Sequence, residues 1–174
     1  MENETLKTLC ERRSIRKYRP EQVGREELEA ILKAGTFAPT GRNSQSPVMV
    51  VVQDPGLIAK LAKLNAEIWE KDVDPFFGAP TDIIVFSDKR VHTYLYTGSL
   101  VMGNLMNAAH SVGVGSCWVH RAKEMFETEF GRELMKKWGL DENYEGIGNC
   151  VIGYAAGDIP AAKPRKDGYV IFDK

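Results

Sequence analysis

Short apolar runs that alternate with amphipathic segments constrain the fold of this chain more than any other feature. Residues 48–52 and 82–86 are nearly continuous and rich in β-branched side chains, a pattern typical of strands that are covered on both faces. Residues 114–119 and 148–153 predict two further strands. Because segments with helical spacing lie between these runs, we expect an α+β fold in which helices surround a central mixed sheet of four strands.

Apolar side chains at intervals of three and four residues predict helices between the strands. The predicted helices cover residues 4–13, 26–34, 54–69, 91–112 and 123–138. The helix over residues 91–112 is apolar nearly all round and contains several small residues. Exposure of such a surface to water is unfavourable, so we expect this helix in the centre of the protein or at an oligomer interface.

The C-terminal segment predicts a strand that has no obvious partner in its own chain. Residues 169–172 are apolar, and they follow an irregular stretch that contains Pro160 and Pro164. A strand this far from the compact part can pair with an open sheet edge of another subunit. We therefore expect residues 1–174 to form a single domain, with residues 158–174 as an extended tail that packs on the partner of a homodimer.

The composition is that of an ordinary globular chain. Hydrophobic residues make up 43% and charged residues 27% of the chain, and no apolar run approaches the roughly 20 residues of a membrane-spanning helix. The 23 Lys and Arg residues are balanced by 24 Asp and Glu, which leaves a net charge of -1. We expect neither membrane insertion nor a nucleic-acid partner, since nucleic-acid binding proteins carry excess positive charge.

Several common kinds of site are absent from the sequence. Cys10, Cys117 and Cys150 form no C-x-x-C pair, and the histidines lack metal-ligand spacing, so we expect neither a disulfide framework nor a metal. Glycine-rich nucleotide-binding motifs and the G-x-S-x-G nucleophile motif are also missing. The first residues lack a secretory signal, which favours a cytoplasmic protein.

A cluster of basic residues follows the first predicted helix. Residues 12–19 carry five guanidinium or ammonium groups and the hydroxyl of Ser14. Cations at a helix C-terminus gain about 0.3 to 1 kcal/mol from the helix dipole, which explains one or two of them without any function. Alternatively, Arg12, Ser14 and Arg16 point to one side of an extended chain and converge on a phosphate.

A loop over residues 38–45 combines Pro, Gly and two carboxamides. Loops of this composition are usually just turns. The side chains of Asn43 and Gln45 can also donate and accept hydrogen bonds at the same time, which suits the edge of a flat heterocycle such as a flavin. Both interpretations of the loop remain open from the residues alone.

Four motifs spread along the chain carry a family resemblance. They are E-R-R-S-I-R-K-Y at residues 11–18, A-P-T-G-R-N-S-Q at 38–45, G-V-G-S-C-W-V at 113–119 and K-P-R at 163–165. Together they resemble the nitroreductase-like flavoprotein family over nearly the whole chain, which implies the fold of that family, a homodimer and bound FMN. Two features depart from the family: Ser46 and Pro47 stand where many relatives carry Pro-Trp, and residues 65–77 match no family pattern.

The resemblance implies a role in FMN binding for residues of each motif. The phosphate and ribityl groups would be held by Arg12, Arg13, Ser14 and Arg16, and the tail would close on the phosphate through Lys163 and Arg165. The loop would reach the flavin, in many members that of the partner subunit, through Pro39, Thr40, Asn43 and Gln45. The isoalloxazine ring would be lined by Trp118, Val119 and His120. Neither Asn65 nor Lys71 is aligned by a motif, so a flavin contact from the middle of the chain stays open.

The activity implied by the resemblance is that of an oxidoreductase without a catalytic side chain, because the flavin carries the chemistry. A hydride would pass from NADH or NADPH through FMN to a flat acceptor, such as a nitroaromatic or a quinone, in ping-pong turnover. One alternative is an FMN-binding storage or sensor protein without fast turnover. Another is a reductive dehalogenase or a flavin-cleaving relative on the same fold.

Overall fold

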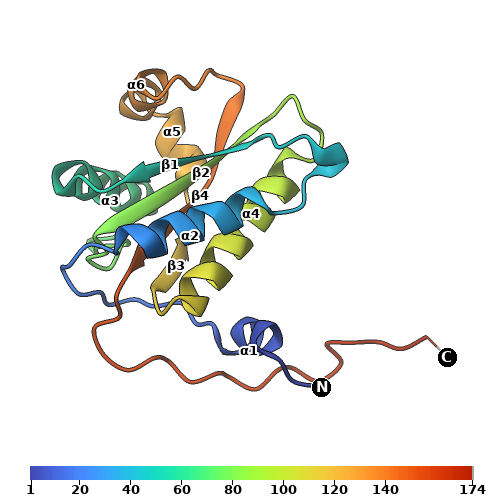
Figure 1. The fold of residues 1–174 in the computed structure, drawn as a ribbon. Helices are drawn as coiled ribbons and strands as arrows, with labels where there is room; N and C mark the ends of the chain where they lie inside the picture. Colours follow the sequence, from blue (N-terminus) through green and yellow to red (C-terminus); the bar gives the residue numbers. More distant parts are fainter. Residues whose placement is uncertain (174) are drawn as a thin grey trace.

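A four-stranded sheet with helices on both faces forms the body of the protein (Figure 1). The computed structural model describes residues 1–173. Its strands are β1 (Pro47–Val52), β2 (Thr81–Asp88), β3 (Gly115–Val119) and β4 (Tyr144–Gly153). Its helices are α1 (Glu4–Glu11), α2 (Arg25–Thr36), α3 (Pro55–Trp69), α4 (Tyr94–Ser111), α5 (Ala122–Glu127) and α6 (Glu129–Lys137), with a short 3-10 turn η1 (Gly41–Asn43). No helix among these residues is long and apolar enough to cross a membrane.

The sheet has the strand order β1-β2-β4-β3, and each neighbouring pair of strands is antiparallel. The α+β class and the four strands are therefore confirmed. The expected mixed sheet is wrong, because all three strand pairs are antiparallel. An isolated parallel bridge joins Ser14 to Ser116 beside β3, outside the four strands. The sheet consequently has two edges: the outer edge of β1 has no partner strand in residues 1–173, and β3 is accompanied by the N-terminal segment.

Alternating side chains of the central strand β2 fill two separate hydrophobic cores. Ile84 and Phe86 face the core under α3, α5 and α6, whereas Ile83 and Val85 face the core under α2 and α4. All four are inaccessible to solvent. Because successive strand residues point to opposite faces, this short apolar run can cover both sides of the sheet.

The helix boundaries follow local capping. Asp54 accepts a hydrogen bond from the backbone of Leu57 and fixes the start of α3 as predicted. The prediction of a single helix over residues 123–138 is wrong, because the helix is interrupted at Thr128. The Thr128 hydroxyl accepts from the backbone of Gly131 and starts α6 in a new direction.

Two other expectations differ from the structure. Strand β4 begins at Tyr144, earlier than expected, because an irregularity between Gly146 and Gly148 interrupts the pattern without ending the pairing. Residues 158–173 of the tail form no strand within one chain. Val170, Ile171 and Phe172 are 65%, 88% and 81% exposed, and the segment extends away from the body of the protein (Figure 1).

Asp82, at the start of β2, is the most unusual residue of the core. It is completely buried, and neither of its carboxylate oxygens has a hydrogen-bond partner in residues 1–173. Burial raises the pKa of this carboxyl well above its usual value of 3.8, because the charged form cannot be solvated. The carboxyl therefore keeps its proton in the folded protein at pH values where an exposed Asp has lost it.

Asp82→Asn is expected to stabilise the protein at neutral pH and to change little below about pH 4. Between the unfolded and the folded pKa, only the folded state holds the proton, so the stability of the natural protein falls as the pH rises. The amide abolishes this dependence, and its advantage grows by about 1.4 kcal/mol per pH unit within that window. Urea denaturation at a series of pH values measures the difference, and parallel pH profiles for the two proteins would contradict it.

Candidate functional site

The basic segment after α1 lies along the edge of β3 like an additional short strand. Ser14 forms the parallel bridge to Ser116, and the backbone of Ile15 donates to the Ser116 carbonyl at 2.9 Å. A side chain at Gly115 would collide with Ile15, as its Cβ would lie 2.9 Å from Ile15 Cγ1. The glycine at the start of β3 therefore permits the close approach that holds the segment in place.

Arginine side chains of this segment carry buried nitrogens without partners. Nη1 of Arg12 and Nε of Arg13 are buried and make no hydrogen bond in the described part of the chain. Nη1 of Arg13 donates to the backbone carbonyls of Cys10 at 2.8 Å and Arg12 at 2.7 Å, which fixes the direction of that side chain. Buried donors without partners are costly, so this place suits a bound anion.

Three residues of the segment converge beside Cys117 of β3. Burial raises the pKa of the Cys117 thiol, while the charges of Arg16 and Arg12 and the hydroxyl of Ser14 act in the opposite direction. The guanidinium carbon of Arg16 also lies 6.0 Å from the ring centre of Phe77. The structure thus places Arg12, Ser14 and Arg16 near Cys117 at one edge of the sheet, and their joint binding of a phosphate stays a prediction.

The three predicted residues at the end of β3 do not share one surface. Trp118 packs against the core under α4 and touches Gly148, whereas Val119 is buried in the opposite core. His120 follows the strand and is exposed. Because side chains alternate along a strand, Val119 faces the same core as Cys117, whereas Trp118 faces the opposite one.

Asn65 of α3 fastens the turn that follows β3. This side chain is fully buried, and its Nδ2 donates to the His120 carbonyl at 2.7 Å and to Sδ of Met125 at 3.1 Å. Its Oδ1 accepts from Nη1 of Arg121 at 3.3 Å. Asn65 therefore adjoins the predicted site, but its hydrogen-bonding groups already have partners within the chain.

Arg121 is a site neighbour that the sequence reasoning missed. It directly follows His120, and its half-buried guanidinium lies 4.3 Å from the ring centre of Trp69. The signal that could have found it is its position, one residue beyond the third motif. Lys71, the other open candidate, is exposed and lines a separate cavity of about 960 Å³ beside α3, whose lining contains none of the predicted site residues.

The loop before β1 is held in an unusual conformation. Arg42, Asn43 and Gln45 all have positive φ, at 55°, 54° and 47°. The Thr40 hydroxyl accepts from the backbone of Gln45 at 3.1 Å, and Nε2 of Gln45 donates to Asn43 at 3.3 Å. Non-glycine residues adopt this backbone region at a cost of about 1 to 3 kcal/mol each, and such residues cluster at functional sites.

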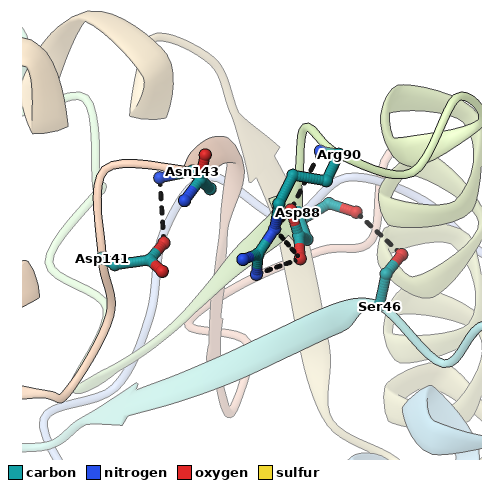
Figure 2. A network of polar contacts seen from close by, with 6 residues as sticks. Ser46, Asp88, Arg90, Asp141 and Asn143 are labelled. Atoms are coloured by element: carbon teal, nitrogen blue, oxygen red, sulfur yellow. Dashed lines mark hydrogen bonds and ion pairs between the residues drawn. The ribbon is translucent and has the colours of Figure 1, made fainter.

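Contacts on both sides of the loop keep it in place. Gly41 lies so close to Thr93, which precedes α4, that a side chain there would overlap it. Beyond the loop, Ser46 contacts the Ser87 hydroxyl at 3.5 Å. Figure 2 shows this contact beside the forked pairing of Arg90 with Asp88, where the closest atoms lie 2.6 Å apart. The loop is thus anchored to the end of β2 and the start of α4.

The loop and the basic segment lie at opposite ends of α4 (Figure 1). Gly41 packs on Thr93 at one end, whereas Arg13 lines a cavity of about 130 Å³ with His110 at the other. Thr93 and His110 are separated by seventeen positions, or roughly 25 Å along a helix. Pro39, Thr40, Asn43 and Gln45 therefore do not meet the arginine cluster within one chain.

The basic residues of the tail are also separate from the cluster. Lys163 and Arg165 are exposed, and the recorded contact between them is a hydrogen bond of 3.0 Å from Arg165 Nη2 to the Lys163 carbonyl. No hydrogen bond or ion pair in residues 1–173 joins either of them to Arg12, Arg13 or Arg16. One chain alone does not close the tail over the predicted phosphate position.

Comparison with known proteins identifies the family. The model of the Nitroreductase family matches residues 9–154. This chain belongs to the nitroreductase family. The match includes the basic segment, the loop and β3, and it ends before the K-P-R motif of the tail.

Two relatives of known sequence are enzymes by name. A protein of Archaeoglobus fulgidus, provisionally named NADH dehydrogenase/NAD(P)H nitroreductase, is 29% identical, and the alignment covers 98% of this chain and 92% of the relative. An FMN reductase [NAD(P)H] of Bacillus subtilis is 26% identical over 94% of this chain and 70% of its own. The family and these names support an oxidoreductase.

Solved structures of nitroreductases share the fold. The nitroreductase of Bacteroides fragilis with bound FMN superposes with a TM-score of 0.90 at 25% identity, covering 99% of this chain and 100% of the other. The nitroreductase of Desulfitobacterium hafniense with bound FMN gives 0.87 at 26% identity, with coverage of 99% and 100%. The expected nitroreductase-like fold is confirmed.

Asn65→Ala is expected to lower the free energy of unfolding by about 2 kcal/mol, because it leaves the partly buried His120 carbonyl and the Arg121 guanidinium without their partner. Asn104→Ala is the matched control, since this amide also donates to a backbone carbonyl, that of Ala34 at 2.9 Å, from a half-buried position. The free energy of unfolding of Asn104→Ala is expected to fall by about 1 kcal/mol. Urea denaturation compares the two, and equal losses would show that Asn65 has no special role in fixing the turn.

Proposed function

We propose that this chain is an FMN-dependent oxidoreductase that transfers a hydride from NADH or NADPH to a flat acceptor, such as a nitroaromatic or a quinone, in ping-pong turnover. The observation that carries the proposal is the pair of buried, unpartnered guanidinium nitrogens of Arg12 and Arg13 beside β3. The family match and the FMN-bound structures of relatives support it.

The residues at this edge of the sheet fit the phosphate of FMN. Nη1 of Arg12 and Nε of Arg13 lack partners, and an oxyanion is the acceptor that guanidinium groups bind best. Ser14 adds a hydroxyl, and the exposed Arg16 adds a further charge. The chain as a whole has a net charge of -1, so the attraction for an anion is local to this segment.

The protein contributes binding and orientation to the proposed reaction. FMN, when bound, supplies the group that accepts and returns the hydride. The bridge between Ser14 and Ser116 fixes the arginines relative to β3, and Asn65 fixes the backbone of His120. Rigid placement of this kind reduces the entropy lost on forming the reactive arrangement.

We also propose a homodimer in which the loop of one chain completes the site of the other. Within one chain the loop lies roughly 25 Å from the arginine cluster, measured along α4. Leu95, Tyr96 and Leu100 on α4 are 49%, 70% and 46% exposed, which is typical of a helix that packs against a partner. The free edge of β1 would accept the tail of the partner as an added strand.

Reduction of the purified protein tests the proposed function directly. The protein is loaded with FMN, freed of excess cofactor and mixed anaerobically with NADH or NADPH, and the flavin absorbance is followed before and after addition of a nitroaromatic or a quinone. We expect the flavin absorbance to fall rapidly on addition of NADH or NADPH and to recover on addition of the acceptor. Bleaching far slower than enzymatic turnover would indicate a storage or sensor protein, and failure to retain FMN would overturn the proposal.

Arg12→Ala is expected to weaken FMN binding by about 10- to 100-fold, the equivalent of 1.5 to 3 kcal/mol for a charge-assisted hydrogen bond. Arg25→Ala provides the control, because this exposed residue pairs with Glu29 on the outside of α2 and surface pairs contribute little. Fluorescence titration with FMN measures both dissociation constants. Unchanged affinity in Arg12→Ala would remove the phosphate role from this residue.

A chain that ends at residue 157 is expected to keep its fold but to associate less tightly. The removed residues include the exposed apolar side chains of the tail and both Lys163 and Arg165, while the two hydrophobic cores stay intact. Light scattering at decreasing concentrations measures the dimer, and circular dichroism checks the fold. A truncated protein with the same dimer stability and FMN affinity as the full chain would exclude the proposed role of the tail.

A further inference from the structure

Arg121 has a backbone conformation that its residue type disfavours. Its φ and ψ are 75° and 13°, in the left-handed region, which a residue with a Cβ adopts at a cost of about 1 to 3 kcal/mol. The turn is fixed from outside, because Asn65 holds the preceding carbonyl of His120 at 2.7 Å. Glycine would adopt this turn without strain, so the presence of an arginine here indicates that its side chain has a role.

The guanidinium group of Arg121 is held in one position but is largely unused. It lies 4.3 Å from the ring centre of Trp69, and its Nη1 donates to Asn65 at 3.3 Å. No carboxylate lies within 4.0 Å of it in residues 1–173, whereas Arg19, Arg25 and Arg90 each pair with one. A guanidinium has five N–H donors, so most of the donors of Arg121 are free to bind a ligand.

The surroundings of Arg121 suit a flat ring that carries a carboxylate. The guanidinium fork binds a carboxylate through two parallel hydrogen bonds, and its planar face stacks on aromatic rings. Trp69 is 43% exposed and Arg121 is half-buried, so a ligand can reach this pair from solvent. Arg121 also lies one residue beyond His120, next to the segment that the family resemblance assigns to the flavin ring.

We propose that Arg121, supported by Trp69 and Asn65, determines acceptor specificity by selecting aromatic acceptors with a carboxylate. The inference rests on the proposed function for the position of the acceptor. It goes beyond that function by naming the substrate class and the residue that recognises it. Arg121 takes no part in the hydride transfer itself, so its removal alters which acceptor binds and not whether the flavin is reduced.

A pair of acceptors with the same shape and different charge tests the proposal. The probes are 4-nitrobenzoate and the neutral 4-nitrobenzamide. Their dissociation constants are measured on the oxidised, FMN-loaded protein without a hydride donor, and their KM values are measured with saturating NADH. Arg121→Gln removes the charge, and Arg121→Gly removes the charge together with the backbone strain, so it remains informative if the first variant folds poorly. Arg25→Gln is the matched control on α2.

The natural protein is expected to bind the carboxylate more tightly than the amide. Arg121→Gln and Arg121→Gly are expected to weaken 4-nitrobenzoate binding about tenfold, the lower end for a charge-assisted hydrogen bond, and to leave the amide within about twofold. A natural protein without charge preference, equal losses for both probes, or no loss for the carboxylate would each overturn the inference. Absence of turnover with intact, Arg121-dependent carboxylate binding would instead overturn the proposed function alone.

Discussion

The alignment of the basic segment with β3 is the interaction on which the proposed site depends. Without the bridge between Ser14 and Ser116, the arginines would belong to a flexible exit from α1. With it, every second residue is directed toward the same face of the sheet, and Arg12 and Arg16 lie near Cys117. Gly115 makes the alignment possible, since a larger residue would push Ile15 away from the strand.

The length of α4 separates the loop over residues 38–45 from the basic segment over residues 12–19, which the sequence motifs suggested would meet. The loop packs on one end of this helix and the basic segment on the other, so a cofactor bound by both must lie between two chains. In the proposed isologous dimer two equivalent sites would form, because the loop of each chain would lie beside the arginines of the other. The exposed apolar residues of α4 and of the tail supply surfaces for such an assembly.

The parts of the fold set by local sequence were predicted well. The Asp54-Pro55 start and regular apolar spacing gave the bounds of α3, and the β-branched runs gave β1 and β2. The break at Thr128 was missed because a polar residue inside a helical pattern becomes a cap only when the packing of the next helix requires it. Tertiary contacts rather than residue type determine such breaks.

The candidate site was predicted in part for similar reasons. The convergence of Arg12, Ser14 and Arg16 followed from strand alternation, and the same alternation should have separated Trp118 from Val119. Arg42, Asn43, Gln45 and Arg121 have positive φ angles, and at Arg121 the turn is fixed by Asn65, which is distant in the sequence. No local rule assigns a left-handed backbone to an arginine, and so Arg121 could be found only in three dimensions.

The buried nitrogens of Arg12 and Arg13 have a consequence for the life of the protein in a cell. A ligand that satisfies them binds the folded chain and not the unfolded one, and at a hundredfold excess over its dissociation constant it adds about 2.7 kcal/mol to stability. A gain of that size is a large part of the margin that keeps a typical domain folded. The steady-state amount of this protein would then rise and fall with the supply of that ligand, since unfolded chains are the ones that proteases remove.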